Sequence, residues 1–440
     1  MNNYDSQKTL ELLEEKYTIS RKSDPQEADL IILMTCSVRE KAAEKIFSDL
    51  GLYQKLKKNY KGVLSRLLIA VGGCVASHYG PEISKRAPQV DIIFGPQNIQ
   101  SLADLTENSW NSTEHEKTVE IRIQKTVQEK FAALAKLKRT EIKENQLSIT
   151  IMEGCNNCCT YCAVPQARGA EVSRNFAEII NEIKNNITTE VALDLVFLGQ
   201  NVNNYKYQDE NGQQRLSDLL KEANKFEGIC RIQFISSHPR YFGPDLINSY
   251  QKLQKLSSHL HLPVQSGSNS ILQAMRRNYT IEEYCKLVES IRQLRPDLTL
   301  GTDIIVGFPG ETQIDFEETC SLVEKIGFDS SYSFTYSPRP GTRAAKMETH
   351  QILGNRLSIL QDLLQQTARK LWYNLVGTRR MALIDIVTKD QARTDHGKKI
   401  RLTKKATKEE IHLRRCPIEI IDLDKQKKEL IGEICSLETP

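Results

Sequence analysis

Between residues 146 and 345 the sequence alternates six times between a short apolar segment and a segment with helical periodicity. Short apolar segments of this kind predict buried strands, and the stretches between them predict helices. Six strand–helix units over about 200 residues favour an α/β fold. The expected form is a parallel barrel that does not quite close, that is, a partial (β/α)6 barrel. The predicted strands are Leu147–Met152, Leu193–Leu198, Arg231–Ile235, His259–Leu262, Leu298–Val306 and Ser331–Thr335.

Residues 1–104 carry the same alternation on a smaller scale. Short apolar segments are followed by a loop and then by a helical stretch, so we expect an N-terminal parallel α/β domain. Cys36 and Cys74 come directly after the first two strands, at the edge where such sheets place their ligands. The predicted strands of this domain are Ala28–Met34, Leu67–Val71 and Val90–Phe94.

The rest of the chain divides by composition. Residues 105–145 are polar and charged, and we interpret them as a linker that is helical in part, through Gln128–Leu137. The barrel is expected to occupy residues 146–374, including a long helix near its end. Residues 375–440 contain strand-like runs separated by charged turns, which predict a small C-terminal β-barrel.

Composition and charge narrow the class of protein. A chain of 440 residues is longer than one core usually serves. The net charge of +4, from 60 Lys and Arg against 56 Asp and Glu, neither requires nor opposes nucleic-acid binding. No apolar run is long enough to cross a bilayer, and the first residues lack the features of a signal peptide. We therefore expect a cytoplasmic monomer with no membrane partner.

Four of the eleven cysteines lie within residues 155–162. In a reducing compartment such a group favours metal binding over disulfides. The C-x₃-C-x₂-C spacing of Cys155, Cys159 and Cys162 puts three thiols on one loop, where they can hold an iron–sulfur cubane and leave one iron open. Zinc with Cys158 as fourth ligand is an alternative, although four adjacent thiols crowd a tetrahedral site. Unligated thiols are the remaining interpretation.

This spacing after a first barrel strand resembles the radical-SAM signature, and longer motifs are similar to those of the radical-SAM methylthiotransferases. The resemblance covers nearly the whole chain. It rests on Thr35–Lys41, Gly73–Ala76, Ile151–Cys155, Ala163–Pro165, Arg168–Arg174, His261–Ser268, Gly307–Glu311 and Arg339–Thr342. Two further motifs, Leu198–Asn203 and Ser236–Pro239, resemble the branch that acts on N6-dimethylallyladenosine in tRNA.

The resemblance implies a function and its cofactors. The cluster held by Cys155, Cys159 and Cys162 would bind S-adenosylmethionine through its open iron and, once reduced, give a 5′-deoxyadenosyl radical. That radical takes hydrogen from C2 of the modified adenosine next to the anticodon of a tRNA. A second 4Fe-4S cluster supplies sulfur, which a second S-adenosylmethionine methylates. The electron donor and the sulfur source are not identified.

Two alternatives to this function are open. A methylthiotransferase of the same family could act on another modified adenosine or on a ribosomal protein. In a different class, the chain could be a tRNA-binding protein with a degenerate N-terminus that cannot deliver sulfur.

The second cluster is incomplete in this sequence. Cys36 and Cys74 match two of its three ligands in the family. Members usually have, before a segment like residues 1–6, a strand followed by Gly-Cys-Gln, and the sequence given starts at that segment. We therefore expect the first strand and the third ligand to be absent. A misplaced start codon is the preferred explanation, and true loss of the second cluster is the alternative.

Polar residues after the barrel strands are candidates for contact with S-adenosylmethionine, because barrel enzymes build their sites at that end. They are Gly199, Gln200 and Asn201 after the second strand and Gln265 and Ser266 after the fourth. Ordinary polar turns are the competing interpretation. His238, which precedes Pro239, is interpreted as no more than a capped loop residue.

The C-terminal segment lies where the family has its TRAM domain, a small β-barrel that grips tRNA. Repeated basic residues make it suitable for phosphate contacts, although acidic residues dilute the charge and a solvated surface is the alternative. These basic residues are Arg379, Arg380, Lys398, Lys399, Arg401, Lys404, Lys405, Arg414 and Arg415.

Overall fold

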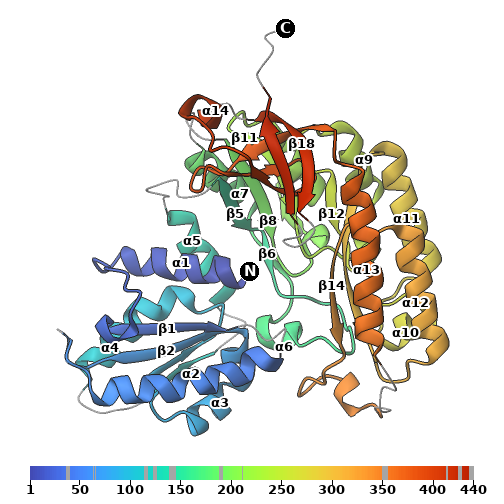
Figure 1. Ribbon diagram of the computed structural model, residues 1–440. Coiled ribbons are helices and arrows are strands. Elements are labelled where there is room, and N and C mark those ends of the chain that lie inside the picture. Colours follow the sequence, from blue (N-terminus) through green and yellow to red (C-terminus); the bar gives the residue numbers. More distant parts are fainter. Residues whose placement is uncertain are drawn as a thin grey trace. The chain divides into compact units, whose positions relative to one another are not determined.

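The structure is a computed structural model that describes residues 1–35, 40–62, 64, 66–112, 117–121, 126–137, 145–187, 192–210, 212–348, 355–412, 415–424 and 429–435. The chain forms two compact units (Figure 1). The first contains residues 1–137, 153–157 and 162–174, and the second contains residues 138–152, 158–161 and 175–440.

The first unit is built on a parallel sheet of four strands in the order β1 (Leu30–Thr35), β2 (Leu68–Gly73), β3 (Ile92–Phe94) and β4 (Thr118–Glu120). Its helices are α1 (Asn2–Glu14), α2 (Glu40–Lys58), α3 (Cys74–Arg86), α4 (Leu102–Asn111), α5 (Thr126–Lys136) and α6 (Val164–Arg168), with 3-10 turns at Pro25–Glu27 and Ile99–Ser101. This confirms the predicted N-terminal parallel α/β fold.

Helices cover both faces of this sheet, with α1 on one side and α2 and α3 on the other (Figure 1). Ile69 and Val71 of β2 are completely buried and pack in one cluster with Leu50 of α2 and Ile83 of α3. A strand buried on both faces reads as a continuous apolar run, as β2 does.

The stretch interpreted as a linker contributes structure to the first unit. Within residues 105–145, β4 extends the parallel sheet and α5 buries Phe131 and Leu134. The helical part of the prediction, Gln128–Leu137, corresponds closely to α5. The polar composition of the segment concealed the strand, because β4 is only three residues long and partly exposed.

The second unit begins with six parallel strands in two sheets, β5 (Gln146–Thr150), β8 (Leu193–Leu198) and β11 (Ile229–Phe234), then β12 (His259–His261), β13 (Thr299–Val306) and β14 (Ser330–Thr335). A bridge between Ile232 and Leu256 leads from β11 toward β12. The helices packed around them are α7 (Phe176–Asn186), α8 (Leu216–Asn224), α9 (Pro244–Lys252), α10 (Asn269–Ala274), α11 (Ile281–Leu294), α12 (Gln313–Ile326) and α13 (Arg356–Tyr373). All six strands agree with the partial (β/α)6 barrel predicted from the sequence.

Shorter elements complete this part. They are β6 (Met152–Glu153), β7 (Val172–Ser173), the hairpin of β9 (Lys206–Asp209) and β10 (Gly212–Arg215), and 3-10 turns at Val202–Asn204, Pro239–Tyr241 and Ala344–Lys346. Local capping chemistry explains several helix starts. Thr280 and Glu283 form a capping box at α11, and Thr312 and Asp315 form another at α12. Each box satisfies backbone N–H groups that have no partner within the helix.

The C-terminal strands form a closed barrel in the order β15 (Arg379–Ile384), β16 (Gln391–Thr394), β17 (Lys399–Leu402), β19 (Glu429–Ile434) and β18 (Cys416–Asp424), with α14 (Lys408–His412) beside it. Its core contains Ile400, Ile418 and Leu430. The barrel confirms the predicted C-terminal fold. Arg231 of β11 joins it to the β/α strands through a hydrogen bond of 2.5 Å to the Thr394 carbonyl.

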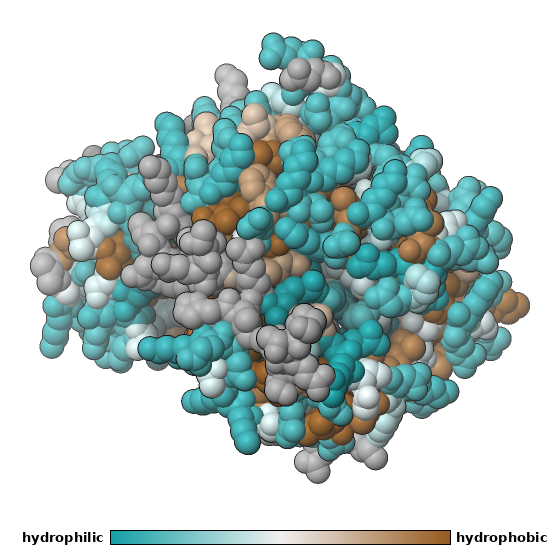
Figure 2. All heavy atoms as spheres, turned by 90° about the horizontal axis from the view of Figure 1, so that it is seen from above, coloured by the Kyte–Doolittle hydropathy of each residue, from teal (hydrophilic) through white to brown (hydrophobic). Residues whose placement is uncertain are grey.

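Large apolar side chains that are exposed in the described part of the chain include Leu52, Ile314 and Val387. Hydrophilic residues cover most of the face shown in Figure 2, and hydrophobic residues form small patches there. Within the described ranges, no helix is both long enough and apolar enough to span a membrane.

Candidate functional site

The cysteine loop lies between β6 and α6 and has no regular secondary structure from residue 154 to residue 163. Cys155, Cys159 and Cys162 are partly exposed, and Cys158 is exposed. The three cysteines of the C-x₃-C-x₂-C pattern are therefore on one loop and within reach of a ligand from solvent.

Glycine is required at the start of this loop. Gly154 has a φ of +78°, and a Cβ atom there would come within 1.9 Å of the Ala170 carbonyl oxygen. The close approach allows the Cys155 N–H to donate to the Gly169 carbonyl at 3.1 Å. At the other end of the loop the Val164 N–H donates to Cys162 Sγ at 3.5 Å.

Thr160 fixes the middle of the loop within the second unit. Its N–H donates to the Met275 carbonyl at 3.1 Å and its hydroxyl donates to the Ala274 carbonyl at 3.0 Å. Its own carbonyl accepts from the Ala344 N–H at 2.9 Å. Because neither helix nor strand supports the loop, these bonds set the backbone position of the neighbouring Cys159.

The donor set fits a 4Fe-4S cluster. Three thiols on one loop supply three irons of a cubane and leave the fourth open. In the parts of the chain described here, no three His, Cys, Asp or Glu side chains converge as ligands of a single metal ion.

The candidate ligands of the second cluster lie elsewhere. Cys74 is the first residue of α3 and is partly exposed. Cys36 follows β1 and lies outside the described residues. Sequence reasoning placed both just after strands of one sheet, and β1 and β2 are indeed neighbours.

A buried network of four charges lies in the first unit, next to the start of the cysteine loop. Lys130 Nζ is 2.9 Å from Asp5 Oδ1 and also binds Glu153. Arg168 binds Asp5 at 2.5 Å and Glu153 at 3.3 Å. The exposed fractions of the four side chains are 0–4%. Two cations and two anions cancel, which is the condition under which charges are tolerated away from water.

The pKa values in this network follow from burial and pairing. Burial alone would raise the pKa of Asp5, but Arg168 and Lys130 outweigh it and lower that pKa below its usual value. Burial likewise opposes the charge of Arg168, yet Asp5, Cys74 and Glu153 raise its pKa well above normal. Arg168 therefore lies close enough to Cys74 for the two groups to interact electrostatically.

The loop after β8 contains Gly199, Gln200 and Asn201. A Cβ atom on Gly199 would lie 2.7 Å from the Met152 side chain, so glycine lets the ends of two strands approach. Just beyond, Asn203 joins this loop to the loop after β11: its amide donates to the His238 carbonyl at 2.8 Å and its carbonyl accepts from the His238 N–H at 2.9 Å. His238 itself caps the 3-10 turn Pro239–Tyr241, since its Nδ1 accepts from the Arg240 N–H at 3.2 Å.

Gln265 and Ser266 follow β12. Gln265 has a φ of +74° and extends the strand pairing, with its N–H bound to the Asp303 carbonyl at 2.8 Å. Ser266 is completely buried, and its hydroxyl lies 3.4 Å from the Thr319 hydroxyl and accepts from the Ser268 N–H at 3.2 Å. Both residues are thus built into the turn, and their contact with S-adenosylmethionine stays a prediction.

The basic residues of the C-terminal barrel divide into two kinds. Arg379, Lys399, Lys404 and Lys405 are exposed, although Arg379 also pairs with Glu419 at 3.8 Å, and Arg380 is half-buried. Lys398, by contrast, is buried beneath Trp372, and its Nζ is 2.5 Å from Asp329 Oδ2. Among the others, Arg401 pairs with Asp424 and Glu429, Arg415 pairs with Asp395, and Arg414 lies outside the described residues. Only part of the predicted basic surface is therefore available for phosphate.

Comparison with known proteins decides the family. The radical SAM superfamily matches residues 149–323, and "Uncharacterized protein family UPF0004" matches residues 1–95. The tRNA-2-methylthio-N(6)-dimethylallyladenosine synthase of Hahella chejuensis is 41% identical over 407 residues, which cover 90% of this chain and 89% of that protein. The synthase of Nitrosomonas europaea is 44% identical over 88% of this chain and 85% of its own. The chain belongs to this synthase family.

Membership confirms the predicted family and makes the chain a radical-SAM methylthiotransferase. It also confirms the cofactors S-adenosylmethionine and a 4Fe-4S cluster. Among solved structures, the radical S-adenosylmethionine methyltransferase TsrM from Kitasatospora setae aligns with a TM-score of 0.50 at 12% identity, over 77% of this chain and 71% of that one. At that identity the likeness concerns the fold alone.

Replacing Asp5 with Asn should destabilise this methylthiotransferase. The change leaves the buried cations Lys130 and Arg168 with one carboxylate between them, and breaking a buried pair costs about 3–5 kcal/mol of unfolding free energy. Urea unfolding measures the loss. Asp104→Asn is the matched control, because Asp104 pairs with Lys16 on the exposed surface and should leave stability nearly unchanged. Equal stability of the two variants would contradict the role given to the network.

The protein should also lose stability in acid through His238. Burial, followed by the charges of Arg277 and Arg240, lowers its pKa from 6.5 to about 2. Below about pH 6.5 the unfolded chain therefore takes up a proton that the folded chain does not, and stability falls by about 1.4 kcal/mol per pH unit. Above that pH the effect vanishes.

Urea unfolding at about pH 7.5 and about pH 5.5, compared between wild type and His238→Asn, measures this contribution. Asparagine keeps a capping acceptor for the Arg240 N–H but does not titrate. The wild type should lose about 1.4 kcal/mol more than the variant between the two pH values. The same loss in both proteins would mean that His238 is not the titrating group.

Proposed function

We propose that this enzyme adds a methylthio group to C2 of N6-dimethylallyladenosine next to the anticodon of tRNA. The observation that carries the proposal is the three-thiol loop in a chain 41–44% identical, over most of its length, to synthases named for this nucleoside. When bound, a 4Fe-4S cluster and S-adenosylmethionine supply the radical chemistry. We also propose that it acts in the cytoplasm as a monomer, with a separate electron donor and sulfur source.

The residues of this chain take the following parts in the proposal. Cys155, Cys159 and Cys162 hold the radical-forming cluster, and the hydrogen bonds of Thr160 keep their loop in place. Cys36 and Cys74 supply two of the three ligands of the second cluster, with Arg168 as the positive charge near Cys74. The loop residues that position S-adenosylmethionine are Gly199, Gln200, Asn201, Gln265 and Ser266.

The C-terminal barrel, residues 375–440, is proposed as the tRNA-binding domain. Its exposed Lys404 and Lys405 lie between β17 and α14 and are suited to phosphate contacts. Lys398 has no such part, since its ammonium group is held by Asp329 and Trp372.

Replacing each of Cys155, Cys159 and Cys162 with Ala should abolish reductive cleavage of S-adenosylmethionine and remove the iron of that cluster. Loss of one of three ligands leaves the cubane with too few thiolates. Iron analysis and the yield of 5′-deoxyadenosine from anaerobically reconstituted protein measure the two effects. Cys158→Ala is the control, because its exposed thiol lies on the same loop but outside the pattern. A Cys158 variant as inactive as the others would refute the ligand assignment.

The double variant Lys404→Gln, Lys405→Gln should bind tRNA more weakly while cleaving S-adenosylmethionine at the wild-type rate. Each lost phosphate contact lowers the slope of log K against log salt by about 0.7–0.9. Filter binding at several salt concentrations measures that slope. Arg401→Gln serves as the comparison, because Asp424 and Glu429 already balance its charge. Unchanged tRNA binding by the double variant would show that both lysines are ordinary solvated surface residues without phosphate contacts.

A further inference from the structure

The segment after α10 has an unusual backbone. Arg276 and Asn278 have φ angles of +56° and +55°, in the left-handed region that residues other than glycine seldom adopt. Such conformations persist where the surroundings dictate them, often at functional sites. Here the Arg276 N–H donates to the Gln273 carbonyl at 3.0 Å, and the Arg277 N–H donates to the Leu272 carbonyl at 2.9 Å.

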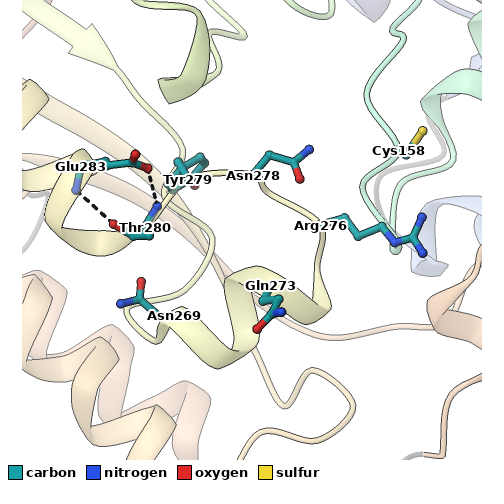
Figure 3. Close-up of a pocket in the computed structure, with 8 residues that line it drawn as sticks. All are labelled: Cys158, Asn269, Gln273, Arg276, Asn278, Tyr279, Thr280 and Glu283. Atoms are coloured by element: carbon teal, nitrogen blue, oxygen red, sulfur yellow. Dashed lines mark hydrogen bonds between the residues drawn. The ribbon is translucent and has the colours of Figure 1, made fainter.

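This backbone sends neighbouring side chains in opposite directions. Arg276 and Asn278 are exposed and line an open pocket of about 810 Å³ together with Cys158 of the cysteine loop (Figure 3). Arg277, between them, is only 6% exposed. The strained residues therefore flank an arginine that is directed into the protein.

The guanidinium of Arg277 is held by three donated hydrogen bonds. NH2 donates to the Pro263 carbonyl at 3.2 Å and Nε donates to the Tyr279 hydroxyl at 3.3 Å. The Tyr279 hydroxyl in turn donates to the Val264 carbonyl at 2.7 Å. The remaining nitrogen, NH1, donates to Cys159 Sγ at 3.6 Å. The planar fork of arginine is fixed on two sides and presents its third side to one thiol.

Among the residues that the structure describes, Arg277 has no carboxylate partner, which distinguishes it from the buried charges of the first unit. Burial by itself would lower its pKa, and Tyr279, Tyr161 and Cys159 are the groups that raise it instead. Among the residues that the structure describes, no carboxylate forms an ion pair with it. Burial also raises the pKa of Tyr279, so that phenol stays neutral. When Cys159 binds a cluster as a thiolate, it would bring a negative charge to this buried cation.

We propose that Arg277 is a positioning residue that holds the Cys159 thiolate and raises the reduction potential of the cluster bound there. The inference rests on the proposed function, which makes Cys159 a cluster ligand. Reduction adds one electron to the cluster, and a fixed positive charge with an N–H donor at a ligand sulfur stabilises the more negative state. Hydrogen bonds to cluster sulfurs are among the factors that set such potentials.

The test compares the reconstituted holoenzyme with Arg277→Gln, Arg277→Lys and Arg276→Gln. Iron content and an EPR-monitored titration against a low-potential viologen dye give the loading and the midpoint potential. Arg277→Gln should make reduction at least tenfold less favourable, which is about 59 mV for one electron. Arg277→Lys keeps the positive charge but loses the forked set of donors. Its midpoint potential should therefore lie between those of the wild type and Arg277→Gln. Arg276→Gln changes the exposed neighbour and should have the iron content and midpoint potential of the wild type.

Two results would overturn the inference. One is a fully loaded Arg277→Gln protein with the wild-type potential. The other is loss of iron from that variant together with a lower melting temperature of the metal-free chain, since Arg277 would then serve the fold alone. Loss of iron with an unchanged melting temperature of the metal-free chain supports the inference. Failure of the proposed function would be distinguishable from failure of this inference, because in that case the wild-type chain itself would bind no cluster.

Discussion

The position of the cysteine loop depends on Thr160. The loop has no helix or strand of its own, so its backbone polar groups need partners from other segments. Thr160 meets this need with three hydrogen bonds, to Ala274, Met275 and Ala344. These partners follow the fourth and sixth strands of the β/α barrel. The hydrogen bonds therefore anchor the irregular cysteine loop to the barrel. A site of fixed geometry requires support of this kind.

Buried charge is handled in two different ways in this chain. Asp5, Lys130, Glu153 and Arg168 form a closed set whose charges cancel, which is what a purely structural network requires. Arg277 is also buried, and its partners within the described part of the chain are two neutral oxygens and one thiol. A compensated set is tolerated away from water without any ligand, whereas an uncompensated cation gains most when an anionic ligand is present.

Much of the fold and the core of the site could be predicted from the sequence because their signals are local. Strand-length apolar runs located all six barrel strands, and cysteine spacing located the loop. The missed features depend on contacts distant in sequence. Lys130 is one charged residue in a polar stretch, and nothing nearby shows that it meets Asp5, 125 residues away. Lys398 belongs to a run of basic residues that predicts phosphate contact, whereas its ammonium group in fact contacts Asp329 and Trp372. Arg277 cannot be told from its exposed neighbour Arg276 by sequence alone.

The hydrogen bonds between Asn203 and His238 have a consequence for how this enzyme can change. They join the loop after β8 to the loop after β11 at both backbone groups of one residue, and the Val202 N–H adds a third bond, to the Ser236 carbonyl. Two loops linked in this way move together. A substitution that displaces one of these loops would therefore be resisted by the other, so a shift of either loop would require substitutions in both.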